Sequence, residues 1–157
     1  MTNATSGSRR RLRTATALGA VSLGLLALSA CQKPTPLTTV TVNGDSVHTQ
    51  AACYNDGKAI PNDKLKDCLS KKPDVSVEVA QGDRVRVGVE PDVADNGWVL
   101  YGSQQQEAFH TTYQSFSGDA FFQSMQGQAP TDSSQLTVLE LKDKKVTGVW
   151  VVKLNRA

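Results

Sequence analysis

Valine alternating with polar residues is the feature that most constrains the fold of this chain. Residues 75–79 read Val-Ser-Val-Glu-Val and residues 85–89 read Val-Arg-Val-Gly-Val, with a Gln-Gly-Asp turn at 81–83 between them. Successive side chains of a β-strand point to opposite faces, so a period of two residues predicts two strands that each bury one face. The pattern therefore predicts a protein built on β-sheets.

The same signal recurs along the rest of the chain, where Asn43-Gly44-Asp45 and Asn96-Gly97 are expected turns. Further strands are expected at 38–42, 46–52, 98–101, 136–141 and 146–154. The last two are expected to pair as a C-terminal hairpin through the turn at 142–145. Many short strands at intervals of about ten residues predict an antiparallel sandwich or barrel.

Three segments carry weaker signals. Aromatic residues in 109–116 fit either a helix or a strand, and the threonines there favour a strand. One or two helical turns are expected at 62–69. A short helix is expected at 118–126, with Phe121, Phe122 and Met125 on its inner side. The predicted fold class is therefore mainly β, an antiparallel β-sandwich with one or two short helices.

The Gly-Asp turn at 82–83, the two valine-rich segments and the strand at Trp98 resemble an immunoglobulin-like sandwich. The cysteines depart from that pattern. In antibody domains the disulfide brackets the tryptophan strand, whereas Cys53 and Cys68 both precede Trp98. The resemblance therefore implies the sandwich architecture and not a disulfide between its sheets.

The first thirty residues have the zones of an export signal. Residues 9–13 carry four arginines, residues 14–30 are small and apolar, and no Asp or Glu precedes Cys31. A basic segment followed by a short apolar one predicts a signal peptide over residues 1–30, with a helix in its apolar part. An uncut membrane anchor is the alternative, but a spanning helix needs about 20 apolar residues, and the apolar segment at 14–30 is shorter. Residues 8–12 also look like a twin-arginine signal, although a generic basic segment is the simpler interpretation.

The apolar segment ends at Leu28, Ser29, Ala30 and Cys31. This tetrapeptide resembles the lipobox of bacterial lipoproteins, in which the cysteine sulfur receives a diacylglyceryl group and a peptidase then cleaves before it. The resemblance implies lipidation of Cys31 with fatty acids such as palmitate. It also implies a lipid-anchored protein on the extracytoplasmic face of the cell membrane. The chain after the cysteine is similar to small, uncharacterised lipoproteins of high-GC Gram-positive bacteria, which implies no activity.

Cleavage before Cys31 would leave residues 31–157 of the 157-residue chain, a length suited to one domain. We expect a lipidated cysteine and short tether at 31–36 and a single β-rich domain at 37–157. The five tether residues contain two prolines, and at about 3.1 Å per residue they would reach roughly 15 Å. Without the four signal arginines, 13 Lys and Arg face 15 Asp and Glu, and the formal net charge changes from +2 to −2. This charge argues against a nucleic acid or an acidic lipid surface as partner.

The three cysteines fit the same interpretation. If Cys31 carries lipid, Cys53 and Cys68 remain as a pair, and paired cysteines outside the cytoplasm oxidise. The alternative is a metal or redox pair, but the redox spacing is absent and no further cysteine is free to complete a zinc site. We therefore predict a disulfide between Cys53 and Cys68, which would close a loop of about 15 residues.

No motif for catalysis or for a cofactor follows the lipobox. The chain has two histidines, His48 and His110, and lacks a Gly-x-Ser-x-Gly nucleophile turn and any glycine-rich phosphate loop. A blue-copper site is not expected, because residues 126–157 contain no Cys, His or Met. The acids at 90–95 lack calcium-loop spacing and are expected to be solvated loop acids beside an ordinary turn. No catalytic residue, metal or cofactor is predicted.

One surface feature remains. Three glutamines at 104–106 follow the tryptophan strand, and aromatic residues follow at 109, 113, 116, 121 and 122. Either these segments form a surface for a ligand or partner, or the aromatics fill the core while the glutamines face water. We expect a binding or interaction module, with an unknown protein or small ligand as partner. An envelope enzyme using dispersed acidic residues and an envelope assembly factor are the alternatives.

Overall fold

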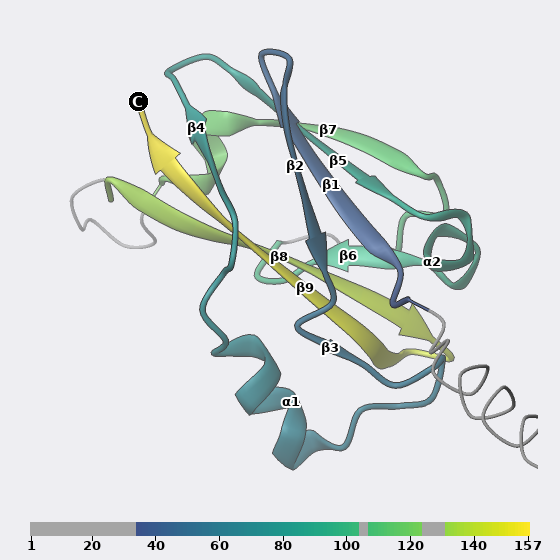
Figure 1. The fold of residues 1–157 in the computed structure, drawn as a ribbon. Coiled ribbons are helices and arrows are strands. Elements are labelled where there is room, and N and C mark those ends of the chain that lie inside the picture. Colours follow the sequence, from purple (N-terminus) through teal and green to yellow (C-terminus); the bar gives the residue numbers. More distant parts are fainter. Residues whose placement is uncertain (1–33, 104–106, 124–130) are drawn as a thin grey trace, which may run out of the picture. The chain divides into compact units, whose positions relative to one another are not determined.

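A computed structural model describes residues 34–103, 107–123 and 131–157. The chain divides into two compact units, Met1–Pro34 and Thr35–Ala157. In the second unit two β-sheets face each other, as Figure 1 shows, which confirms the expected β-sandwich. The expected signal-peptide helix, the lipobox and Cys31 lie outside the described residues.

The first sheet has the strand order β2-β1-β5-β7 and is antiparallel throughout. Its strands are β1 (Leu37–Val42), β2 (Asp45–Gln50), β5 (Arg84–Val89) and β7 (Tyr113–Ser117). Asn43 and Gly44 both have positive φ angles, of 50° and 96°, which is the backbone of a tight hairpin turn. The expected turn between β1 and β2 is therefore confirmed.

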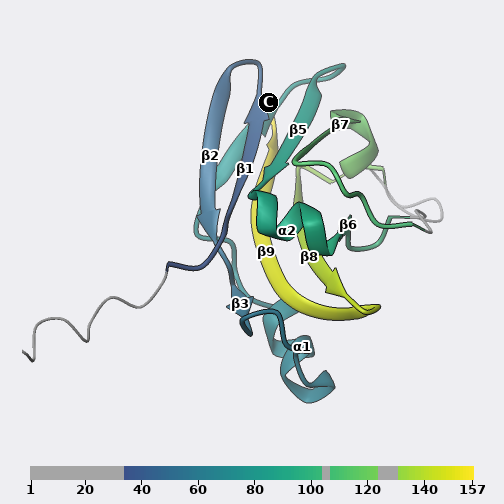
Figure 2. The same ribbon diagram turned by 90° about the vertical axis from the view of Figure 1, so that its right-hand side faces the viewer.

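The second sheet has the order β3-β9-β8-β6, and β4 also pairs with β9. Its strands are β3 (Cys53–Tyr54), β4 (Ser76–Val79), β6 (Trp98–Leu100), β8 (Ser133–Lys142) and β9 (Lys145–Arg156). The C-terminal hairpin is confirmed, and its two strands extend beyond the expected ranges. Figure 2 shows β9 curving as it crosses the sandwich.

The two valine-rich segments form strands, as predicted, but lie in different sheets. β5 is central in the first sheet, whereas β4 pairs in parallel with β9 in the second. The turn between them is held by Asp83, whose side chain accepts from the N–H of Ala80. Alternation shows which face of a strand is buried but not which strand it pairs with. The pattern therefore did not reveal that the chain passes from one sheet to the other here.

Helix α1 (Asn62–Leu69) confirms the expected helical turns, and the 3-10 helix η2 (Gly118–Phe121) replaces part of the helix expected at 118–126. Residues 124–130 lie outside the described residues. The prediction of an ordinary turn at 90–97 was wrong, because residues Pro91–Asn96 form helix α2, whereas the acids Glu90, Asp92 and Asp95 are exposed, as expected. Proline at the first helical position has the φ angle that a helix needs, and its missing N–H costs nothing there.

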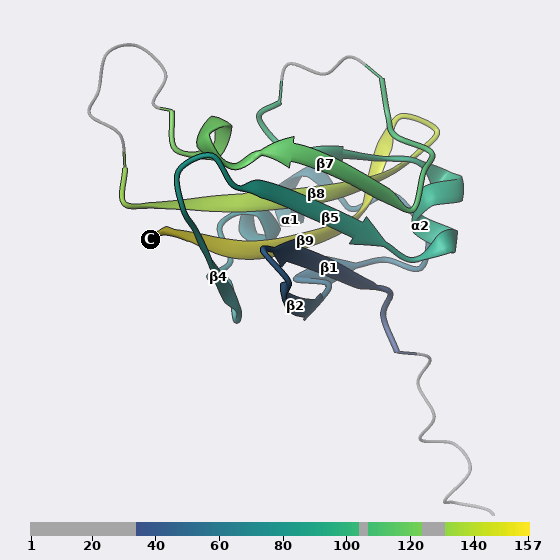
Figure 3. The same cartoon turned by 90° about the horizontal axis from the view of Figure 1, so that it is seen from above.

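Two apolar clusters stabilise the sandwich. The main core lies between the sheets and includes both fully buried tryptophans, Trp98 and Trp150. The second lies on the outer face of the second sheet, where Val149 and Val151 pack with Ile60 and Cys68 beneath α1. The predicted disulfide between Cys53 and Cys68 is present and ties β3 to α1. Figure 3 shows the sheets stacked as layers in this unit.

Candidate functional site

The start of β1 is fixed at one end of the sandwich. The Trp150 indole N–H donates to the Pro36 carbonyl at 2.8 Å, and the Leu37 N–H donates to a Glu90 carboxylate oxygen at 3.0 Å. Glu90 directly follows β5 and directly precedes α2. We call this the anchor end, because a tether from Cys31 would join the domain here.

A cleft lies toward the other end of the sandwich, where β6 and β7 end and β8 begins. Its volume is 340 Å³. Its lining is aromatic and aliphatic with serines among them: Leu100, Tyr101, Gly102, Ser103, Phe116, Ser117, Ala120, Phe121 and Ser134. None of these residues is charged. We call this the distal cleft, because β7 begins at the anchor end with Tyr113 opposite Gly88 and reaches the cleft at Ser117 opposite Arg84.

A row of aromatic rings connects the core to the distal cleft. Ring centroids are 4.8 Å apart for Trp98 and Phe109, 5.8 Å for Phe109 and Phe116, and 6.2 Å for Phe116 and Phe121. Tilted and edge-on ring pairs at these distances are favourable. Because each ring packs on the next, the two that line the cleft are held from the core side.

This arrangement answers the question that the sequence left open about the aromatics. Phe122 is buried in the core, Phe109 packs against the core, and Phe116 and Phe121 both pack on the core and line the cleft. The predicted strand at 109–115 begins only at Tyr113, since Phe109 makes a single β-bridge with Trp98. The glutamines at 104–106 lie outside the described residues.

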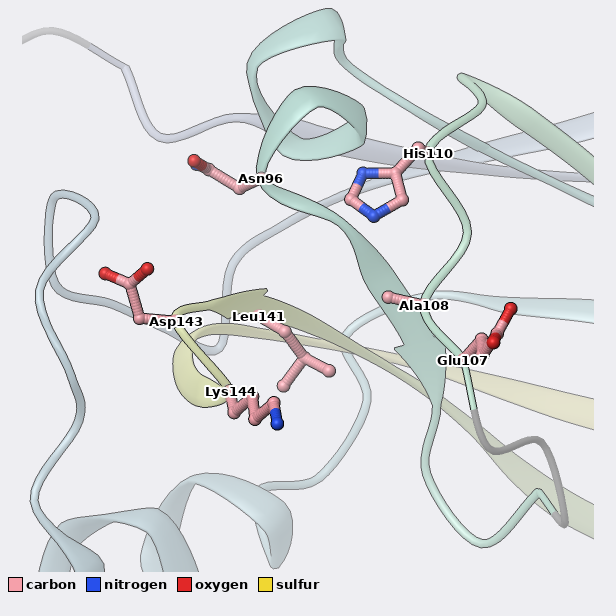
Figure 4. Close-up of a pocket in the computed structure, with 7 residues that line it drawn as sticks. All are labelled: Asn96, Glu107, Ala108, His110, Leu141, Asp143 and Lys144. Carbon is pink, nitrogen blue, oxygen red and sulfur yellow. The ribbon is translucent and has the colours of Figure 1, made fainter.

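A larger pocket of 690 Å³ lies beside α2 and the β8–β9 turn. Figure 4 shows Asp143 on one side of it, Glu107 on the other, and His110 near α2. The three side chains come from different directions and do not converge on one point. The geometry therefore gives no acid–base pair acting on one substrate atom.

A buried carboxylate ties α2 to the second sheet. Glu140 is fully buried on β8, where it accepts from Asn96 Nδ2 at 2.7 Å and from Thr147 Oγ1 at 2.8 Å. Gly148 lies opposite it on β9, and a Cβ there would approach Glu140 Oε2 to 3.1 Å and the Trp150 ring to 2.5 Å. Burial raises the pKa of the nearby Tyr54 phenol, and the negative charge of Glu140 raises this pKa further.

Both oxygens of Glu140 are used within the fold, so its role is structural. Sequence reasoning did not single it out. The available signal was its position, because Leu136, Val138 and Glu140 alternate along one face of β8 and two of them are core residues. An acid in register with core residues indicates a buried carboxylate with polar partners.

The other residues considered from the sequence are dispersed. His48 contacts Thr39 on β1 through Nδ1 and Oγ1 at 2.9 Å, whereas His110 lines the pocket beside α2. Among the described residues no group of three or more His, Cys, Asp or Glu is arranged to hold a metal ion. The helices of the described ranges include none that is long and apolar enough to cross a membrane.

Comparison of the chain with protein-family models, with curated proteins and with solved structures gives no match. The site is therefore interpreted from its own chemistry.

Proposed function

We propose that this chain is an extracytoplasmic lipoprotein that is cleaved before Cys31, is anchored by lipid on that cysteine, and acts as a binding module and not as an enzyme. The lipobox-like residues 28–31 support the anchor. The distal cleft is the observation that carries the binding function. Its 340 Å³ volume and its mainly apolar lining are typical of ligand sites in proteins.

The lining of the distal cleft indicates the chemistry of its ligand. An uncharged wall offers no counter-charge, so a charged group would lose its hydration without compensation. The rings of Phe116 and Phe121 favour an apolar or aromatic group, and the hydroxyls of Ser103, Ser117 and Ser134 can exchange hydrogen bonds with its polar edge. The ligand is therefore a neutral apolar group, either of a small molecule or of a protein side chain.

The position of the cleft suits a membrane-anchored binding protein. Strand β1 begins at Leu37, and the five residues 32–36 between it and Cys31 reach roughly 15 Å. Attachment through the anchor end would leave the opposite end of the domain, which holds the distal cleft, free of the tether. A partner in the extracytoplasmic space then has access to it.

An envelope enzyme that uses dispersed acids is less well supported. Such an enzyme needs a carboxylate at the position where substrate binds, and the described lining of the distal cleft holds none. The most deeply buried acid, Glu140, uses both of its oxygens for hydrogen bonds inside the fold. A binding function does not require any carboxylate to react.

Photo-crosslinking in intact cells tests the cleft directly. Benzoylphenylalanine in place of Tyr101 is expected to form an adduct, because Tyr101 lines the cleft and is 62% exposed. Leu37 is the control, since it is 38% exposed and begins β1 at the anchor end, away from the cleft. Adducts of equal yield at both positions, or none at Tyr101, would contradict the proposed site.

A further inference from the structure

The distal cleft lies beside an open sheet edge. Strand β7 lies at one edge of the first sheet, as Figure 3 shows. In the second sheet the short strands β3 and β4 lie at one edge, paired with β9, and at the other edge Phe109 exchanges two backbone hydrogen bonds with Trp98 on β6. The outer edge of β7 borders the cleft, because Phe116 and Ser117 line it.

The register of β7 shows which backbone groups face outward. Val89 N–H donates to the Thr112 carbonyl, and Gly118 N–H donates to the Asp83 carbonyl. In an antiparallel pair such bonded positions alternate, so the even-numbered residues of β7 bond to β5. The N–H groups of Ser115 and Ser117 consequently point to the outer edge, and neither donates to another described residue.

The sequence of β7 does not protect this edge. Proteins commonly guard edge strands with lysine, proline or a bulge, and β7 reads Tyr-Gln-Ser-Phe-Ser with a regular register. The chain occupies one edge carbonyl itself, because the Arg84 guanidinium donates to the Ser115 carbonyl at 3.3 Å. Within the described ranges no acceptor uses the two serine N–H groups, so they are available to an incoming chain.

We infer that the occupant of the distal cleft is an extended peptide that adds to β7 as a further strand and places a neutral apolar side chain in the cleft. This inference rests on the proposed binding function. Residues directly opposite each other on paired strands share a face, so the peptide residue opposite Phe116 points into the cleft. Backbone carbonyls of the peptide accept from Ser115 and Ser117, and the cleft selects the side chain, as in other cases of strand addition.

Ser117→Pro separates strand addition from simple occupation of the cleft. Ser117 has a φ angle of −69°, which proline adopts without strain, and its N–H is not used within the sheet. The substitution therefore removes an edge donor and leaves the domain intact. Ser117→Ala is the matched control, because it removes the hydroxyl and keeps the N–H.

The binding measurement uses linear peptides selected from a displayed random library on the full-length chain in detergent. Selected peptides are expected to carry an apolar residue in an extended segment whose side chains alternate between the two faces. They are expected to bind the Ser117→Pro variant roughly tenfold more weakly than the wild type. Ser117→Ala also loses the cleft hydroxyl, so it is the reference, and Ser117→Pro is expected to bind roughly tenfold more weakly than Ser117→Ala. Thermal unfolding of both variants checks that the domain is folded.

Three outcomes distinguish the two proposals. Peptides that bind Ser117→Pro more weakly than Ser117→Ala support strand addition. Equal affinity for both variants, or a library that yields no peptide sensitive to the Ser117 N–H, overturns strand addition. In that case, a Tyr101 adduct in cells would still support the distal cleft as a binding site. The absence of any Tyr101 adduct in the wild type contradicts the cleft and not merely its occupant.

Discussion

Replacing Cys53 and Cys68 together by alanine is expected to lower the free energy of unfolding by about 3 kcal/mol. The bond closes a loop over a sequence separation of 15 residues, and opening it restores conformational freedom to the unfolded chain. Besides the disulfide, this segment is held by the second apolar cluster and by a few hydrogen bonds, such as that from the Gln135 side chain to the Leu69 carbonyl. α1 is eight residues long, which is too short to be stable alone, and it contributes Leu65, Cys68 and Leu69 to the second apolar cluster.

Urea unfolding of the oxidised protein and of the double variant measures this loss. Dithiothreitol added to the wild type should reproduce most of the loss, and added to the double variant it should change nothing. A double variant within about 0.5 kcal/mol of the wild type would show that packing of α1, and not the disulfide, stabilises this face.

Replacing Glu140 by alanine is expected to cost about 3 kcal/mol or more of unfolding free energy. The substitution leaves a buried donor, Thr147 Oγ1, and a part-buried donor, Asn96 Nδ2, without the carboxylate that accepts from them. It also opens a cavity beside Trp150 and Gly148. Both effects act at the junction of α2 with the second sheet.

Two further variants separate these contributions. Glu140→Gln keeps the volume and one acceptor oxygen, so its loss should be smaller than that of Glu140→Ala. Glu78→Ala removes an exposed glutamate from β4 and should stay within about 0.5 kcal/mol of the wild type. Calorimetry of all three at neutral pH makes the comparison. A Glu140→Ala variant as stable as Glu78→Ala would mean that the buried network does not support the fold.

The period-two pattern was enough to predict most of the fold. The β1–β2 turn, the C-terminal hairpin, α1 and the disulfide are all present. These features are local in sequence, or depend on a single pairing, and their residues carry the signal themselves. The parallel pairing of β4 with β9 joins residues more than seventy positions apart, and no short pattern encodes it.

Helix α2 was missed for a different reason. Its six residues include the Asn96 that precedes Gly97, and this pair was interpreted as a turn. Gly97 has a φ angle of 99° and follows the helix directly, so the glycine marks a helix end and not a hairpin. Proline at position 91 was the signal that favoured a helix start over a loop.

The distal cleft was only partly foreseeable. The aromatic residues that line it were identified as one of two alternatives, a surface or a core. The sequence could not decide between them, because Phe116 and Phe121 pack against the core on one side and line the cleft on the other. Packing of the two sheets brings together Ser117 and Ser134, which lie in strands of opposite sheets.

Mass spectrometry of the protein from the membrane fraction tests the central claim most directly. The account predicts an N-terminal peptide that begins at Cys31 and carries the mass of the attached lipid. The Cys31→Ala variant, prepared in parallel, should yield no such peptide. Wild-type protein recovered without modification and with residues 1–30 still attached would contradict the proposal of a lipid-anchored binding module.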